Sequence, residues 1–458
     1  MRLLHLIAVV FLAFSGCSKG DDVEPVAKAE SAVQDPPAKE VAAEPGVVRP
    51  LPEGATRHKL ENGLTYILYP TNKAKHIALD VLFGVGGSHD PEGKSGLSHL
   101  VEHIYVTAEA GKEPSRTVHQ YMQRYPLGWN AQTGDDYTII ATVFEKDRLA
   151  NEIEDAAARM GFLNPTQADL DREVPRLLEE VGNMFGGMPQ LAVMNHARDN
   201  LFPSTTGHRK GGVPEQVKLI GLNDVIHWWL DHYKPSNALI VLAGDFDADE
   251  AKGLIEKHFG DIPAGNVPIV VDQPGPAKVG AIHAITITPK MPGAKPFAGI
   301  AFAAPMPNDK HYAACLVIVS RMFQNVMASG TQVMFSPVDD PAVISISAPL
   351  QPDKSDEESI AALRVMLDAA IKKPLTPMET QLTKKMLGMI LGMVEFPRQM
   401  FQGNLYGVAY SIGRCEQLQV DSAKLAKALD ALTDKDIQAA AAAIFDAKKQ
   451  VAVVVKPN

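Results

Sequence analysis

The two halves of this chain end with the same order of elements. In the first half, a predicted helix that begins at residues 222–224 (Leu-Asn-Asp) leads to a predicted strand at 238–243. A helix that begins at 432–434 (Leu-Thr-Asp), 210 residues later, leads to a strand at 451–455. This repeat predicts a duplicated α+β unit. The alternative is coincidence, because many unrelated domains end with a helix followed by a strand.

A segment rich in proline lies between the two halves. Residues 262–280 contain four prolines, which is typical of a linker rather than of a helix or strand. The chain has 458 residues, of which 46% are apolar, so each half can bury a core of its own. We therefore expect one domain at 51–265, a linker at 266–280 and a second domain at 281–458.

The first residues are expected to direct export. Arg2 precedes a largely apolar run at 3–14, which is shorter than the roughly 20 residues of a membrane span, so we predict a signal peptide at 1–17. The segment 14–17 (Phe-Ser-Gly-Cys) resembles a bacterial lipobox, whose cysteine becomes the lipidated N-terminus. An ordinary cleaved signal followed by an accidental Cys17 is the alternative.

Residues 18–50 are rich in Ala, Pro, Glu and Val and contain no aromatic residue, so we expect a flexible tether. Ser18 follows the cysteine where Asp would be expected for retention in the inner membrane, which favours sorting to the outer membrane. The expected location is therefore the bacterial periplasm, with membrane contact only through Cys17.

Charge and the remaining cysteines set two further limits. The net charge of −10 argues against a nucleic-acid partner, because phosphate binding needs a basic surface. Cys315 and Cys415 could pair in an oxidising periplasm or stay as buried thiols, and the sequence leaves both alternatives open.

The strongest chemical signal is the sequence His-Leu-Val-Glu-His at residues 99–103. It lies in a helix that we expect to begin near Ser95, which could cap the first turn. Residues four apart lie on one face of a helix, so His99 and His103 can offer ring nitrogens to one metal ion. A helix with two unrelated histidines is the alternative.

Glu102 lies next to His103, on the adjoining face of the same helix. A catalytic zinc ion takes three protein ligands and keeps one position open, so two histidines need one further carboxylate. Zinc lowers the pKa of water, and a neighbouring carboxylate can take the proton as that water attacks a carbonyl. We interpret Glu102 as this general base.

The order His-x-x-Glu-His is the inverted zinc motif, and its surroundings resemble the pitrilysin/insulinase family, which includes the mitochondrial processing peptidases. The segment 86–88 (Gly-Gly-Ser) precedes the motif, and 233–237 (Tyr-Lys-Pro-Ser-Asn) runs into a strand that ends at 244–245 (Gly-Asp). The likeness covers residues 52–260 well and the remainder more loosely. It implies two similar α/β-sandwich domains of the processing-peptidase type, each a mixed sheet with helices packed on it.

The resemblance also implies the third zinc ligand. In the family this ligand lies in a later helix that has another glutamate two turns earlier. Glu180 lies 77 residues after His103 and seven residues after Glu173, and Glu179 is the competing ligand. We therefore expect one zinc ion bound by His99, His103 and Glu180, with Glu173 as an acid that orients or tunes the site.

In the family, a peptide substrate pairs with the edge strand beside the zinc, and Asn130, Ala131 and Thr133 are the candidates here. A loop that enters a strand is the alternative. Active members also carry an Arg/Tyr pair in a second half. The best local match places Ala328 and Phe335 at those positions, and neither side chain can donate to an oxyanion. We interpret other polar side chains of this half, including Tyr410 and Arg414, as structural or surface residues.

The missing pair and the chain length imply a partner. The family closes four such domains around a chamber, so we expect a related subunit that carries the Arg/Tyr pair, or a homodimer. The expected function is zinc-dependent cleavage of peptides or unfolded segments. The rivals are a non-catalytic scaffold and a subunit that binds peptides without cutting them, but the complete set of ligands and Glu102 favours the enzyme.

Overall fold

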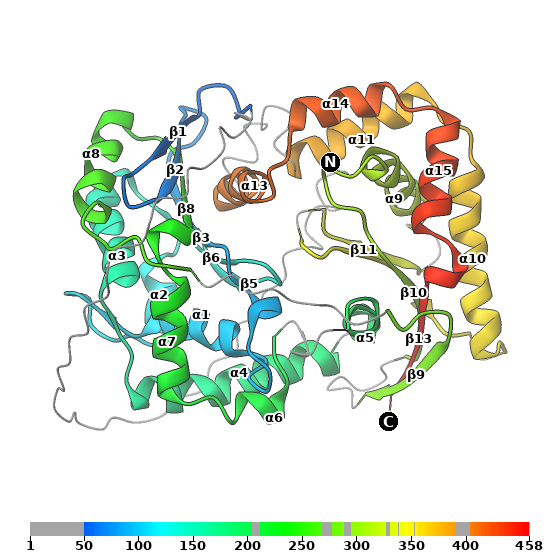
Figure 1. Ribbon diagram of the computed structural model, residues 1–458, viewed down its shortest axis with the longest axis horizontal. Helices are drawn as coiled ribbons and strands as arrows, with labels where there is room; N and C mark the ends of the chain where they lie inside the picture. Colours follow the sequence, from blue (N-terminus) through cyan, green and yellow to red (C-terminus); the bar gives the residue numbers. More distant parts are fainter. Residues whose placement is uncertain are drawn as a thin grey trace. The chain divides into compact units, whose positions relative to one another are not determined.

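Within its described residues, the computed structural model contains two large sheets with their helices (Figure 1), and a two-stranded sheet of residues 109–110 and 163–164. It describes residues 50–187, 189–203, 211–267, 277–287, 295–326, 330–337, 339–351, 353–390 and 404–457. The expected signal peptide with Cys17 and the expected tether, apart from Pro50, lie outside the described residues, as does most of the expected linker. No helix in the described ranges is long and apolar enough to cross a membrane.

The first sheet has six strands within the described residues, in the order β1-β2-β8-β3-β6-β5. β2 runs parallel to β8, and the other neighbours are antiparallel. β1 and β2 are joined by a turn at 61–63, and Gly63 has a φ of 91° that favours glycine. The strands are β1 (Thr56–Lys59), β2 (Thr65–Pro70), β3 (Ile77–Phe83), β5 (Trp129–Thr133), β6 (Thr138–Phe144) and β8 (Ala238–Gly244).

Helices of the first half pack on one face of this sheet. Leu79 and Phe83 of β3 point into the helical layer, where they join Leu100 and Ile104 of α1 in one buried cluster. Pro175 lies inside α4. The helices are α1 (Leu97–Thr107), α2 (Val118–Arg124), α3 (Leu149–Gly161), α4 (Gln167–Gly187), α6 (Pro214–Val217), α7 (Leu222–His232) and α8 (Ala248–Phe259), and the short elements are η3 (Gly87–His89), β4 (Glu109–Ala110), η4 (Lys146–Arg148), β7 (Leu163–Asn164) and η5 (Pro235–Asn237).

The second sheet has five strands within the described residues, in the order β11-β12-β10-β13-β9. Ile300 and Phe302 of β10 pack with Leu316 of α9 in a second buried cluster. The strands are β9 (Ile282–Ile287), β10 (Phe297–Ala303), β11 (Gln332–Phe335), β12 (Val343–Pro349) and β13 (Val451–Pro457), and the helices are α9 (Tyr312–Val326), α10 (Asp356–Lys372), α11 (Pro377–Ile390), α14 (Ser422–Asp430), α15 (Asp434–Ile444) and η6 (Ala447–Lys449).

Five strands of the first sheet, β2-β8-β3-β6-β5, have the same order as β9-β13-β10-β12-β11 of the second sheet, and β1 is additional. β8 lies between parallel β2 and antiparallel β3, and β13 lies between parallel β9 and antiparallel β10. The repeat seen in the sequence corresponds to α7 with β8 and to α15 with β13. The expected fold class, two similar α+β units with helices packed on mixed sheets, is confirmed. The boundaries 51–265, 266–280 and 281–458 stay predictions.

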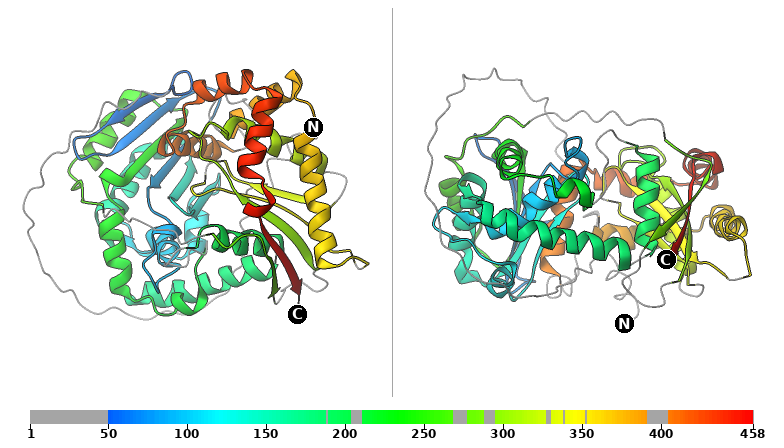
Figure 2. Two further views of the ribbon diagram at one scale, coloured as in Figure 1. Left: turned by 45° about the vertical axis from the view of Figure 1, so that its right-hand side comes forward. Right: turned by 90° about the horizontal axis from the view of Figure 1, so that it is seen from below.

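The second face of each sheet is covered by a helix that the chain contributes from elsewhere (Figure 1; Figure 2). α5 (Pro189–Leu201) packs on the second sheet, where a Cβ on Gly299 would lie 2.3 Å from Cγ1 of Val193. α13 (Leu405–Gln417) packs on the first sheet, where a Cβ on Gly413 would lie 2.8 Å from a methyl group of Leu82. The two sheets are therefore joined by reciprocal helix packing.

Cys315 and Cys415 form no disulfide within the described residues. Cys315 is buried and Cys415 is half-buried. Burial raises the pKa of the Cys415 thiol to about 12 and raises that of Cys315 as well. Both side chains are therefore protonated thiols of low reactivity at neutral pH.

Candidate metal centre

α1 carries the motif and is buried along its whole length. It begins after Gly96, which has a φ of 100°, and a Cβ there would lie 2.7 Å from Cγ2 of Val217 and 3.1 Å from Cα of Gly212. The Asp90 carboxylate caps the helix, because Oδ2 accepts a hydrogen bond from the Gly96 amide at 2.6 Å and Oδ1 accepts one from the Ser98 amide at 2.8 Å. The expectation that Ser95 caps this helix is therefore wrong, since a loop carboxylate satisfies the free amides.

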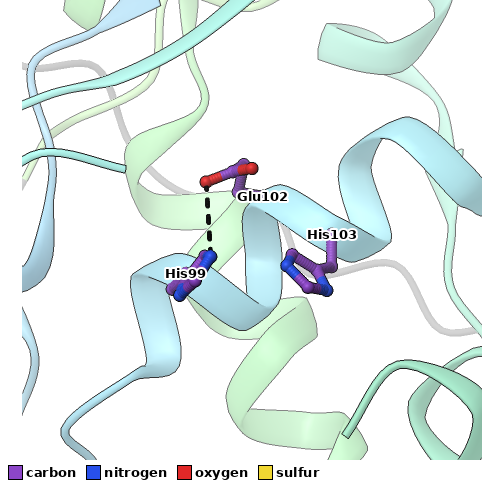
Figure 3. A group of neighbouring side chains, drawn as sticks. All are labelled: His99, Glu102 and His103. Atoms are coloured by element: carbon purple, nitrogen blue, oxygen red, sulfur yellow. Dashed lines mark ion pairs between the residues drawn. The ribbon is translucent and has the colours of Figure 1, made fainter. Parts of the chain in front are cut away.

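His99 and His103 lie one turn apart on α1, with ring centroids 4.8 Å apart and ring planes at 89° (Figure 3). Their side chains are 10% and 3% exposed. Nδ1 of His99 lies 3.4 Å from the Gly211 carbonyl oxygen, which can only accept, so this nitrogen carries the proton. Nε2 of His99 then keeps its lone pair for a metal ion.

Glu180 of α4 completes this group of side chains from a second helix. Its Oε1 lies 3.7 Å from Nε2 of His99, and its Oε2 lies 3.5 Å from Nε2 of His103. Ligand atoms of a tetrahedral zinc site lie about 3.3 Å apart, so a small shift lets these three side chains bind one ion. The Glu180 side chain is 44% exposed, which leaves an approach from solvent, and Glu179 is exposed on the neighbouring face of the helix.

Glu102 is buried between α1 and β5. Its Oε2 lies 4.0 Å from Nε2 of His99, the contact marked by the dashed line in Figure 3, and accepts a hydrogen bond of 2.8 Å from Oγ1 of Thr133. The ligand atoms of His99, Glu102 and His103 all lie within 4.8 Å of one another. Glu180 lies nearer to His99 than Glu102 does, and it also approaches His103, so the position of Glu180 fits a third metal ligand. The position of Glu102 fits a carboxylate that lies beside the ligands without binding the ion.

Glu173 lies on α4 on the other side of the His103 ring. Its Oε2 lies 3.4 Å from Nδ1 of His103 and accepts a hydrogen bond of 2.9 Å from Nη1 of Arg176. Its Oε1 accepts a hydrogen bond of 3.0 Å from Nε of Arg172. The Glu173 side chain is 1% exposed, so it is held by these three neighbours and not by water. Neither arginine is predicted from the sequence. The spacing of three between Glu173 and Arg176 on a helix is a signal for their contact, whereas no helical spacing indicates the contact of Arg172.

The charges of these side chains depend on one another. Burial alone would lower the pKa of His103, but Glu173 and Glu180 outweigh burial and raise that pKa to about 9. Burial would raise the pKa of Glu173 and of Glu180, but His103 and other nearby cations lower each to about 2. Burial lowers the pKa of His99. The carboxylates are thus ionised across the neutral range, as binding of a divalent cation requires.

The candidate substrate-binding residues lie on β5, the edge strand of the first sheet, which packs beside α1. Ala131 and Thr133 face the core that contains α1. Asn130 faces the opposite side of the sheet, because side chains alternate along a strand. Thr133, a candidate for substrate binding, also donates a hydrogen bond to Glu102, which no spacing in the chain indicates.

The position expected to match the family's tyrosine has no hydrogen-bond donor. Phe335 ends β11 and packs against the second core, and Ala328 lies outside the described residues. Arg414 of α13 is buried and pairs with Asp136 of the first half, with Nη2 and Oδ2 2.7 Å apart. Within the described residues, Arg414 thus has a structural contact, in agreement with its interpretation from the sequence.

Two family models match the chain. The model described as Insulinase (Peptidase family M16) matches residues 66–184, which include the motif and Glu180. The model described as Peptidase M16 inactive domain matches residues 220–387, which include most of the second sheet. The chain belongs to the pitrilysin/insulinase family of peptidases.

Curated bacterial relatives are named as zinc proteases. The chain is 27% identical to the zinc protease PqqE of Helicobacter pylori over 206 residues, which are 44% of this chain and 45% of the relative. It is 26% identical to the uncharacterized zinc protease YmxG of Bacillus subtilis over 225 residues, which are 48% of this chain and 53% of the relative. The chain spans about half the length of these curated relatives.

Solved structures share the fold at low sequence identity. A protease from Helicobacter pylori has a TM-score of 0.73 and 19% identity, over 89% of this chain and 100% of that chain. The periplasmic protease PqqL from Escherichia coli has a TM-score of 0.68 and 16% identity, over 89% of this chain and 48% of that chain. At these identities the likeness shows the fold alone.

Proposed function

We propose that this chain is a zinc-dependent endopeptidase that hydrolyses peptides or unfolded segments. The observation that carries the proposal is the approach of the two Glu180 oxygens to Nε2 of His99 and Nε2 of His103, at 3.7 and 3.5 Å. Two imidazoles and one carboxylate are donors that catalytic zinc sites use, and the names of the relatives support zinc over other ions. We infer one zinc ion per chain.

A zinc ion bound there would polarise a peptide carbonyl and lower the pKa of water. Oε2 of Glu102 is the atom that takes the proton from the attacking water and returns it to the leaving amine. The hydroxyl of Thr133 orients this oxygen, and Glu173 and the Gly211 carbonyl hold the rings of the two histidines.

We infer that the substrate binds by adding a strand to β5. β5 lies beside α1, and its outer edge has no strand partner within the described residues. The main chain at Asn130, Ala131 and Thr133 would pair with the main chain of the substrate. Because such pairing does not depend on side chains, the proposed enzyme accepts many peptide sequences.

We further propose that the active unit contains a second chain of this fold, either another copy or a related partner with an Arg/Tyr pair. Phe335 has no group that can donate to an oxyanion. The Escherichia coli neighbour PqqL, of which this chain covers 48%, is long enough for two such chains, which supports an active unit of twice this size.

The proposed location is the bacterial periplasm, with the chain attached to the outer membrane through a lipid on Cys17. The apolar run at 3–14 and the lipobox-like segment 14–17 support this location. The description of the neighbour PqqL as a periplasmic protease agrees with it.

A non-catalytic scaffold or a peptide-binding subunit is the second candidate function. The model that matches residues 220–387 is described as an inactive domain, which favours a supporting role for the second half. The first half holds a full set of donors together with Glu102, which favours catalysis there.

The variant Glu102→Gln tests the proposal. We expect zinc content to stay near one ion per chain while cleavage of an unfolded polypeptide falls by about 10²–10⁴-fold. Glu256→Gln, on the exposed face of α8, is the control and should keep both properties. Unchanged cleavage by Glu102→Gln would remove this residue from the mechanism, and a wild-type chain that holds zinc but cuts nothing, with or without a second chain, would favour the second candidate.

A further inference from the structure

The turn between β5 and β6, residues 134–136, lies next to the candidate general base. At its start, Thr133 donates its hydroxyl hydrogen to Glu102. The carbonyl oxygens of the turn accept hydrogen bonds of 3.0 and 2.8 Å from the amides of residues 87–88, in the segment before α1. Any movement of this turn would therefore move the group that orients Glu102.

β5 itself gives the turn limited support. Within the described residues it is an edge strand, so β6 alone holds it through the main chain. An interior strand has a ladder of hydrogen bonds on both sides. The hydrogen bonds from residues 87–88 hold the main chain of 134–136 on one side, and the two acids of the turn add contacts to other elements.

Asp136 binds α13. Nη2 of Arg414 donates to Oδ2 of Asp136 at 2.7 Å, and the guanidinium lies 4.0 Å from the centre of the Tyr137 ring. The hydroxyl oxygens of Tyr137 and Tyr410 are 2.9 Å apart. The Arg414 side chain is 1% exposed, and a buried arginine cannot leave its carboxylate without a large penalty, so the contact holds the turn against α13.

Asp135 binds α5, the helix that packs on the second sheet. Nη1 of Arg198 lies 2.7 Å from Oδ2 of Asp135, and the two side chains are 8% and 1% exposed. Nη2 of Arg198 donates to the Pro341 carbonyl at 2.9 Å, and the Asp340 amide donates to the carboxylate of Asp136 at 3.3 Å. Two helices and one loop thus converge on the same short turn.

We propose that Arg414 and Arg198 are positioning residues, which hold the 134–136 turn through Asp136 and Asp135 so that Thr133 keeps Glu102 in place. The inference rests on the proposed function, in which Glu102 is the general base. The arginines supply the support that a second neighbouring strand would give to β5. Arg198 of α5 and Arg414 of α13 thereby control the geometry of proton transfer at Glu102.

The first test compares Arg414→Gln with Arg321→Gln in the full chain. Arg321 is also 1% exposed and pairs with the carboxylate of Glu379 at 3.2 Å, but it lies within the second half, between α9 and α11. Below the unfolding temperature of both variants, we expect Arg414→Gln to lower kcat about tenfold or more, with KM and zinc content within twofold of wild type. Arg321→Gln should lose thermal stability to a similar extent and keep kcat.

Two further variants separate positioning from a general loss of packing. Arg414→Lys keeps the charge and should recover part of kcat. Asp136→Asn combined with Arg414→Gln should lower kcat no further than Arg414→Gln alone, because both changes remove the same contact. Equal loss of kcat in Arg321→Gln, or full kcat in a folded Arg414→Gln, would overturn the inference.

Hydrogen exchange of the resting chain tests the inference without any activity. We expect amides of residues 129–137 to exchange faster in Arg414→Gln than in wild type, and at the wild-type rate in Arg321→Gln. Equal exchange in all three proteins would contradict the anchoring of the turn. If exchange differs as expected while the wild-type chain hydrolyses no peptide, the anchoring is supported and the proposed function is the part that fails.

Discussion

Oε2 of Glu173 lies 3.4 Å from Nδ1 of His103, on the side of the ring opposite to the nitrogen that approaches Glu180. A carboxylate in this position fixes the tautomer and the orientation of an imidazole that binds a metal ion through its other nitrogen. Arg172 and Arg176 hold the same carboxylate, so its position does not depend on the ion.

The variant Glu173→Gln should weaken zinc binding about 10–100-fold, because the amide cannot stabilise the charge that His103 shares with the ion. Competition with a chromophoric chelator measures this affinity. Glu154→Gln, on the surface of α3, serves as the control and should bind zinc as wild type does. An affinity for zinc that is equal in Glu173→Gln and wild type would contradict this role.

Adjacent carboxylates on α4 provide a second comparison. Glu180→Ala should lose the zinc ion during dialysis, because only two ligands remain, whereas Glu179→Ala should retain it. Zinc content by atomic absorption measures both. Zinc should also raise the unfolding temperature of Glu179→Ala but not that of Glu180→Ala, since an ion that binds only the folded state stabilises it. The reverse pattern would make Glu179 the ligand.

The hydroxyl of Thr133 should matter for turnover and not for the metal. Thr133→Val removes the 2.8 Å hydrogen bond to Glu102 without a change in volume, and we expect kcat to fall about tenfold or more with zinc content unchanged. Thr142→Val is the matched control, because Thr142 is also buried and its hydroxyl donates to the Leu79 carbonyl on β3. If both variants keep wild-type kcat, Thr133 does not orient the base.

Asp80 lies on β3 with 0% exposure, on the face that α13 covers, and neither of its oxygens has a hydrogen-bond partner among the described residues. Burial raises the pKa of this carboxyl well above its ordinary value of 3.8. For a folded-state pKa that is raised, the contribution to stability is complete below pH 3.8 and is lost as the pH rises toward the folded-state pKa.

The variant Asp80→Asn should therefore stabilise the fold increasingly as the pH rises. We expect the difference in unfolding free energy from wild type to grow by about 1.4 kcal/mol per pH unit above the ordinary pKa, until the folded-state pKa is reached. Urea unfolding from acid to neutral pH measures it, with the exposed Asp261→Asn as control. A difference that does not change with pH would mean that Asp80 is ionised in the folded chain.

The parts of the site that follow from helix geometry could be predicted from the sequence. His99 and His103 were paired by their spacing of four, and the resemblance added Glu180 and Glu173, seven residues apart. All four side chains lie together in the structure. Each helix holds its own pair on one face, so the packing of α1 against α4 brings both pairs into contact. Their roles in binding and catalysis stay predictions.

The contacts that depend on the approach of distant segments could not be predicted. Asp136 and Arg414 are separated by 278 positions, and nothing in the local pattern of either indicates the other. The prediction that Ser95 caps α1 is wrong for a related reason. Serine is a favourable N-cap residue, but the fold brings the Asp90 carboxylate to the free amides at the start of the helix. The preference for serine at an N-cap is outweighed where a loop offers a carboxylate, which accepts stronger hydrogen bonds from the amides.

The exchange of α5 and α13 between the two sheets has a consequence for any attempt to isolate the peptidase half. A truncated protein that stops after α8 would carry α5 without the surface on which it docks, and would expose the apolar face of the first sheet that Val408 and Ile412 cover. Such a fragment would aggregate or bind a replacement helix. The first half alone is therefore not expected to fold as an active enzyme. The two halves must be expressed as one chain and should unfold together in a single transition.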